Sequence, residues 1–244
     1  MHRVLRALTL LAVWLANPAM ADVAPWPTQG RIIYRVYHGD SGLQIGRATH
    51  TWSHDATSYA MTTLVETTGL AALFKDFRYQ QRSEGTLTAA GLRPQRFTVD
   101  QRGKPHQAAV FDWPKGEVRI DRGDSTRQAP LKAGDQDVLS IAHQLAQPGA
   151  AKAPVVLTVV SNKSAAVATV RDLGDASVRL PLGELATRHY SVRSDDGKVR
   201  IEVWLAAAQH GLPVRIRIEN GKGEVLDQQA ERVELGTPVQ GNPS

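Results

Sequence analysis

Apolar and polar side chains alternate along most of this chain, and the alternation predicts short β-strands. Near the start, the apolar Ile32, Tyr34 and Val36 are interleaved with Arg31 and Arg35. Successive side chains of a strand point to opposite faces, so each such segment has one apolar and one polar face. Similar segments, broken by Gly, Pro, Asn or Asp, follow at residues 42–53, 59–65, 79–88, 96–101, 107–113 and 117–121.

The clearest hairpin is predicted near the C-terminal end. Its two strands each turn four apolar side chains to one face: Val199, Ile201, Val203 and Leu205, then Leu212, Val214, Ile216 and Ile218. Arg215 and Arg217 are expected to point outward. Asn220 and Gly221 suit a tight turn into one further strand over residues 224–235.

One segment departs from the two-residue period and predicts an amphipathic helix. Over residues 135–146 the apolar side chains are spaced by three, four and seven positions: Val138, Leu139, Ile141, Ala142 and Leu145. Asp135 or Asp137 is placed to cap the helix, since a short carboxylate accepts hydrogen bonds from its first N–H groups. Pro148 and Gly149 would end it.

These segments predict a mainly β protein with a large curved antiparallel sheet or an incomplete β-barrel, covered by the one amphipathic helix. We expect a single β-rich domain over residues 22–235 and a flexible tail at 236–244. Two halves separated by the small-residue stretch at 147–153 are the alternative. One core beneath one helix explains the same pattern.

The N-terminus has the three parts of a cleaved signal peptide. Arg3 and Arg6 precede ten uncharged, mostly apolar residues, 7–16, and small residues follow at Ala19 and Ala21. Ten residues are too few to span a bilayer as a helix, which takes about 20. We therefore expect residues 1–21 to be removed after Ala21 and the mature protein to be periplasmic.

The composition excludes several kinds of bond and partner. The chain has no cysteine, so neither a disulfide nor a lipid-modified cysteine is available. No later segment is apolar enough to predict an integral membrane helix in the mature chain. Without Arg3 and Arg6, 27 basic residues face 24 acidic ones, a net charge of +3 that is scattered along the strands. We expect no nucleic-acid partner.

The candidate catalytic residues match no familiar site. His50 and His54 would converge on a metal only on a helix, and this stretch predicts strand and turn. Ser140 and His143 face each other on the predicted helix, but a third orienting residue and an oxyanion hole cannot be named. Asp112 is the remaining carboxylate for a glycosidase-like role. We expect no catalytic residue, no metal and no cofactor.

An apolar ligand site is the remaining candidate. A Gly-flanked turn carries Leu70, Leu73 and Phe74, which we expect at the mouth of a concave pocket. Aromatic residues nearby in sequence complete the predicted ligand-binding set, namely Phe77, Phe97, Phe111 and Trp113. The alternative is that these side chains fill the core.

Four short motifs occur in order along the chain, at residues 83–85 (SEG), 91–94 (GLRP), 111–113 (FDW) and 136–140 (QDVLS). In this order and spacing, over about residues 30–235, they resemble the bacterial domain-of-unknown-function family 3108. That resemblance implies an envelope protein and supplies no catalytic residues. The C-terminal motifs VWL and LPVRI look similar to the end of the half-barrel periplasmic carriers of acylated cargo. This more distant likeness implies an incomplete β-barrel over an apolar cavity.

Three functions follow as hypotheses. The first is a non-catalytic periplasmic binding or carrier module for an apolar, lipid-like envelope ligand. The second is a structural or assembly factor that binds another envelope protein through its sheet edges and basic face. The third is an envelope hydrolase that uses Asp112 or a histidine. An enclosed apolar cavity would favour the first, and an exposed apolar patch on a filled barrel the second.

The first prediction concerns export. The charged start, apolar stretch and small residues before position 22 predict a mature N-terminus at Asp22 and recovery in the periplasmic fraction. N-terminal sequencing of the envelope form measures this directly. Recovery of an intact Met1 in the membrane pellet would contradict it.

Overall fold

The computed structural model describes residues 26–39, 41–68, 77–147 and 154–236. The first eight strands follow one another as a meander: β1 (Gln29–His38), β2 (Leu43–His54), β3 (Ser58–Thr67), β4 (Arg78–Thr88), β5 (Gly91–Gln101), β6 (Gln107–Asp112), β7 (Glu117–Asp121) and β8 (Thr126–Pro130). The other seven are β9 (Gln136–Asp137), β10 (Val155–Val160), β11 (Ala165–Leu180), β12 (Gly183–Ser194), β13 (Val199–Ala206), β14 (Leu212–Asn220) and β15 (Val225–Leu235).

All fifteen strands belong to one open, curved sheet. Its order runs from β8 back to β1, then to β15 and back to β9. Every neighbouring pair is antiparallel except β9 and β10, which are parallel. The sheet therefore consists of two meanders joined where β1 pairs with β15, and β8 and β9 remain as its two edges. The predicted fold class is confirmed.

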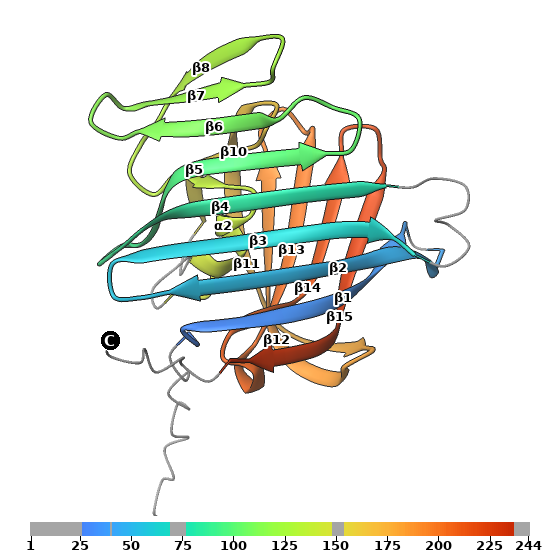
Figure 1. Cartoon of the computed structure of the whole chain (residues 1–244). Helices are drawn as coiled ribbons and strands as arrows, with labels where there is room; N and C mark the ends of the chain where they lie inside the picture. Colours follow the sequence, from blue (N-terminus) through green and yellow to red (C-terminus); the bar gives the residue numbers. More distant parts are fainter. Residues whose placement is uncertain (1–25, 40, 69–76, 148–153, 237–244) are drawn as a thin grey trace, which may run out of the picture.

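The curvature brings the two meanders face to face. In Figure 1, β1–β6 cross in front of β10–β14, and the short helix α2 (Ser140–Gln144) lies between these layers. Buried apolar side chains form two clusters, one dominated by the first meander with Ile32 and Phe97, and one joining α2 to the second meander through Ile141 and Val203. The concave interior is thus shared by both halves of the chain.

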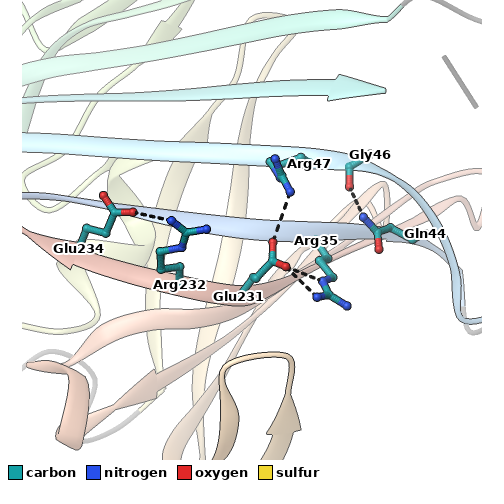
Figure 2. Close-up of polar contacts among 7 residues, drawn as sticks. All are labelled: Arg35, Gln44, Gly46, Arg47, Glu231, Arg232 and Glu234. Carbon is teal, nitrogen blue, oxygen red and sulfur yellow. Dashed lines mark hydrogen bonds and ion pairs between the residues drawn. The ribbon is translucent and has the colours of Figure 1, made fainter. Parts of the chain in front are cut away.

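The join between the meanders is fastened by ion pairs on the outer face. Glu231 of β15 accepts hydrogen bonds from Arg35 of β1 at 2.7 and 3.0 Å, and lies 3.6 Å from Arg47 of β2 (Figure 2). Farther along β15, Arg232 donates to Glu234. Arginine side chains from two strands therefore converge on one carboxylate across the seam, which favours this register over a shifted one.

The predicted helix bounds were wrong. The helix covers only residues 140–144, because Gln136 and Asp137 pair with β10 as a strand. Asp135 does not cap it, since its carboxylate accepts from the N–H groups of Lys132 and Thr158. Asp137 does lie at the helix start and accepts from the N–H groups of Leu139 and Ser140, at 2.8 Å each.

The predicted C-terminal hairpin is confirmed from Val199 to Trp204, but the pairing shifts between Trp204 and Leu205. Leu212 therefore pairs with Ala206 and does not share the face of Val203, which corrects the predicted single apolar face at this end. Val203 lies opposite Ile216, and both side chains face inward, although Ile216 is only half-buried. Arg215 points outward as predicted but is not simply solvated. It forms a two-pronged ion pair with the buried Asp227, at 2.7 and 2.9 Å, and its guanidinium lies 4.7 Å from the Trp204 ring centroid.

The second prediction tests this register. Val203→Asp would bury an unpaired carboxylate and should lower the free energy of unfolding by several kcal/mol. Arg215→Gln should cost about 2 kcal/mol, because it leaves the buried Asp227 without its charged partner. The matched control Arg179→Gln breaks only an exposed pair with Glu184 and should cost less than about 0.5 kcal/mol. Urea unfolding measures all three, and equal effects of the two arginine changes would contradict the assignment.

Candidate functional site

The candidate site lies inside the curved sheet, around β9 and α2. Side chains anchor this segment to the turn between β4 and β5: Gln144 accepts from the N–H of Leu92 at 2.7 Å and donates to the carbonyl of Ala90. Gln136 donates to the carbonyl of Leu92 at 2.8 Å. Gly91 makes this close approach possible, because a Cβ there would lie 2.3 Å from the Gln144 amide oxygen. The helix is therefore pinned to the first meander at its C-terminal end.

A buried carboxylate fixes the other end of the helix. Asp137 is fully buried, and the Ser83 hydroxyl of β4 donates to it at 2.6 Å. The Tyr59 hydroxyl lies 3.2 Å from the Ser83 hydroxyl and extends the chain of polar groups. Burial raises the pKa of Asp137 to about 6, although its hydrogen-bond donors oppose the rise. Burial also raises the pKa of Tyr59, so this hydroxyl stays protonated.

Two histidines meet between the helix and the first meander. The Nε2 atoms of His50 on β2 and His143 on α2 are 2.8 Å apart, and Nδ1 of His50 lies 2.8 Å from the Thr63 hydroxyl. Since two neutral imidazoles share this contact, one ring must donate and the other accept. Burial lowers the pKa of both, that of His50 to about 4, and the nearby His50 and His54 lower that of His143 further. The pair is therefore neutral at pH 7.

Tryptophans enclose the histidine pair. Trp26 stacks on His54 with ring centroids 4.2 Å apart and lies 5.0 Å from the His143 ring. Trp52 lies 5.9 Å from both His50 and His143. These rings exclude water from one side of the pair, which is the physical cause of the lowered pKa values.

Two small hollows lie beside this polar cluster. The first has a volume of about 30 Å³ and is lined by His50, His143, Thr63 and mostly apolar side chains of α2, β13 and β14. The second has a volume of about 20 Å³ and is lined mainly by apolar residues of β10–β13. Val138 and Ile201 line both, so these two side chains form the partition between the hollows.

The described residues of the predicted apolar site do not line either hollow. Phe97 and Phe111 are buried in the first core cluster, and Trp113 packs against it, donating to the carbonyl of Pro94. Phe77 is half-buried and stacks on Tyr79. Leu70, Leu73 and Phe74 lie outside the described residues, as does the predicted signal peptide at 1–21. Their ligand-binding role stays a prediction.

The other candidate residues have other partners. Ser140 bonds to Asp137 and His143 to His50, so these two helix residues do not form a nucleophile–base pair with each other. Asp112 makes an exposed ion pair with Lys115 at 2.7 Å. Within the described ranges, no three His, Asp or Glu side chains gather so as to hold a metal ion. No described helix is long and apolar enough to cross a membrane.

The buried polar pairs were missed at the level of sequence, although a signal was present. His50 lies two positions from Ala48 and from Trp52, so it shares their inward face of the strand. Ser83 is likewise the inward residue of β4 and is fully buried. A polar residue on the apolar face of a strand needs a buried partner, which marks such positions for inspection.

The family model described as "Protein of unknown function (DUF3108)" matches residues 33–228. A search of curated proteins finds no match. Among solved structures, a beta-barrel-like protein of domain of unknown function DUF1849 from Brucella abortus is 14% identical, with a TM-score of 0.55, covering 86% of this chain and 98% of that chain. This likeness shows a shared fold.

Two other solved structures align over similar lengths with lower scores. One is described as a "putative lipoprotein" from Parabacteroides distasonis, with 10% identity, a TM-score of 0.30, and coverage of 86% of this chain and 97% of that chain. The other, a "putative exported protein" with YmcC-like fold from Bacteroides fragilis, has 11% identity, a TM-score of 0.31, and coverage of 86% and 96%.

The third prediction concerns the pH dependence of stability. The lowered pKa of His50 contributes stability that is present above pH 6.5 and is lost as the pH falls towards 4. The raised pKa of Asp137 has the opposite sign, since its contribution is present below pH 3.8 and is lost as the pH rises through 6.

Two variants separate these contributions. Between pH 7 and pH 5, Asp137→Asn should lose about 1 kcal/mol more stability than the wild type, because it lacks the carboxyl group whose protonation stabilises the fold at low pH. His50→Gln should lose less than the wild type over the same range. Urea unfolding at the two pH values measures both, and a change of slope with the same sign in the two variants would contradict the assignment.

Proposed function

The chain belongs to the DUF3108 family, and we propose that it is a non-catalytic binding module for an apolar, lipid-like ligand, which enters between the β9–α2 segment and the concave face of β10–β14. The observation that carries this proposal is an apolar wall that the helix only partly covers. Leu157, Ile216 and Ile218 face the interior yet remain half-buried. A closed core would bury such side chains fully, so this wall has contact area to offer a ligand.

In this proposal, an apolar chain would lie along the two hollows. They are separated by Val138 and Ile201, and movement of these two side chains would merge them along the inner wall. Val138 is half-buried and belongs to the short connection between β9 and α2. A shift of that connection would break the hydrogen bond from the Val138 N–H to the carbonyl of Val160 and widen the space, while the β10–β14 ladder would stay intact.

The buried polar groups favour binding over catalysis. One oxygen of Asp137 accepts from Leu139 and Ser140, and the other accepts from Ser83. Both ring nitrogens of His50 also have protein partners. A catalytic acid or base needs an oxygen or nitrogen atom that can reach the substrate, whereas the atoms of these groups already bond to the protein and position the helix.

The proposed location follows from the N-terminal residues. A signal peptide ending at Ala21 would release the protein into the periplasm, where an apolar ligand of the cell envelope is at hand. A helix pinned by side-chain hydrogen bonds at both ends, over a partly open apolar wall, suits a protein that holds such a ligand reversibly.

The fourth prediction tests the binding wall. Val138→Phe should fill the space between the two hollows and weaken the binding of a fluorescent fatty-acyl probe by about tenfold or more, since the added ring competes for the same volume. Leu43→Phe is the matched control, because Leu43 is exposed at the start of β2 and the same ring is added outside the wall. Its affinity should equal that of the wild type.

Probe titration and thermal melting are measured on the same preparations. A well-folded wild type that binds no apolar probe would sink the proposal and favour the assembly-factor hypothesis. Equal affinity of Val138→Phe and Leu43→Phe would place the ligand elsewhere on the protein.

A further inference from the structure

The outer face of β10 and β11 carries apolar side chains that the fold leaves in contact with solvent. Val156, Val167 and Leu173 are 66%, 49% and 50% exposed. Val167 and Thr169 lie on one face of β11, and Val156 joins them as the cross-strand partner of Thr169. Leu173, at the irregularity between Asp172 and Gly174, lines the same groove as Thr169. A contiguous exposed group of branched apolar side chains marks an interaction surface.

Arginines border these apolar side chains. Arg171 lies two positions from Thr169 and shares its face of β11. Arg193 of β12 lies directly opposite Thr169. Both arginines are exposed, and neither makes a hydrogen bond or ion pair with another described residue. Their guanidinium groups are therefore free to meet an external anion.

A third arginine adds to the positive charge of this face. Arg200 of β13 is the cross-strand partner of Arg193, although like charges placed opposite each other destabilise a sheet. Arg200 turns to Glu202 on its own strand. The exposed Asp195 is the one carboxylate that lines the groove between these strands. The groove therefore keeps a net positive charge, although the repulsion between Arg193 and Arg200 lowers the stability of the fold.

A groove runs through the arginines. It has a volume of about 390 Å³, and Thr169 and Ser191 line it beside Arg171 and Arg193. Guanidinium and hydroxyl groups together are the donors that bind phosphate oxygens. Leu173 also lines this groove, and Val156 lies next to it as the cross-strand partner of Thr169.

We propose that this outer face, defined by Val156, Val167, Arg171, Leu173 and Arg193, docks on the surface of an anionic phospholipid bilayer. The arginines bind lipid phosphates and the three branched side chains enter the headgroup region, as in other interfacial proteins. The exposed branched side chains next to two arginines that bond to no other described residue match a bilayer surface, which offers phosphates and acyl chains side by side. It lies on the opposite side of the sheet from the proposed ligand wall, so the two proposals stand or fall separately.

Co-sedimentation with vesicles tests the docking face. Mature protein, purified from the exported fraction, is mixed with vesicles of phosphatidylcholine alone or with phosphatidylglycerol added. We expect binding only to the anionic vesicles, weakened by salt. Arg171→Gln with Arg193→Gln should reduce binding by roughly tenfold or more, since each arginine near an anionic surface contributes about fivefold.

Two further variants guard the interpretation. Arg119→Gln with Arg127→Gln removes the same charge from exposed positions on β7 and β8 and should leave binding within about twofold. Val156→Ser with Val167→Ser should weaken binding while the arginines remain. Equal losses from the two arginine pairs, or equal binding to neutral vesicles, would overturn the proposal. Binding to immobilised polyglutamate but not to anionic vesicles would overturn it as well and assign the face to an acidic protein.

Discussion

The pairing of the first and last strands is the constraint on which the whole structure depends. Each meander alone would be an open sheet with an uncovered apolar face, and a sheet must bury that face against another layer. Because β1 pairs with β15, the two meanders become one sheet that curves back on itself, and each supplies the other's second layer (Figure 1). The ion pairs around Glu231 hold this seam in register (Figure 2).

The interior that the seam creates is completed by a segment too short to be stable alone. A helix of five residues does not persist in water, so α2 depends on its surroundings. Asp137 and the two glutamines, Gln136 and Gln144, hold it in one position, and the His50–His143 contact joins its middle to β2. Buried polar contacts of this kind add little net stability, and their main effect here is to specify where the helix lies. Its small size also leaves the wall of β13 and β14 partly uncovered.

Local periodicity was sufficient to predict the fold class and the C-terminal hairpin as far as Trp204, where the pairing shifts. Val203 and Ile216 alternate with charged residues and are joined by a short connection, so their pairing follows from sequence alone. The predicted helix was too long at its start, because Val138 and Leu139 fit a helical period. In the structure, Gln136 and Asp137 instead pair with β10. That pairing, like the contact of His50 with His143, depends on residues far apart in sequence. A local sequence pattern cannot predict such a contact. The only indication in the sequence is that His50 and Ser83 are polar residues at inward-facing strand positions.

The seam also has a consequence for the order of folding. Arg31 and Glu234, which bond across it, are 203 positions apart, so almost the entire chain must be present before the pair can form. Contacts this distant in sequence slow folding, because the entropy of closing the loop is lost before the contact forms. In a chain that is threaded through a membrane from its N-terminal end, β1 would emerge early and remain without one neighbour until the last strand arrives. The sheet would then remain incomplete until the whole chain had crossed, and the pairing of β15 with β1 would be the step that completes the fold.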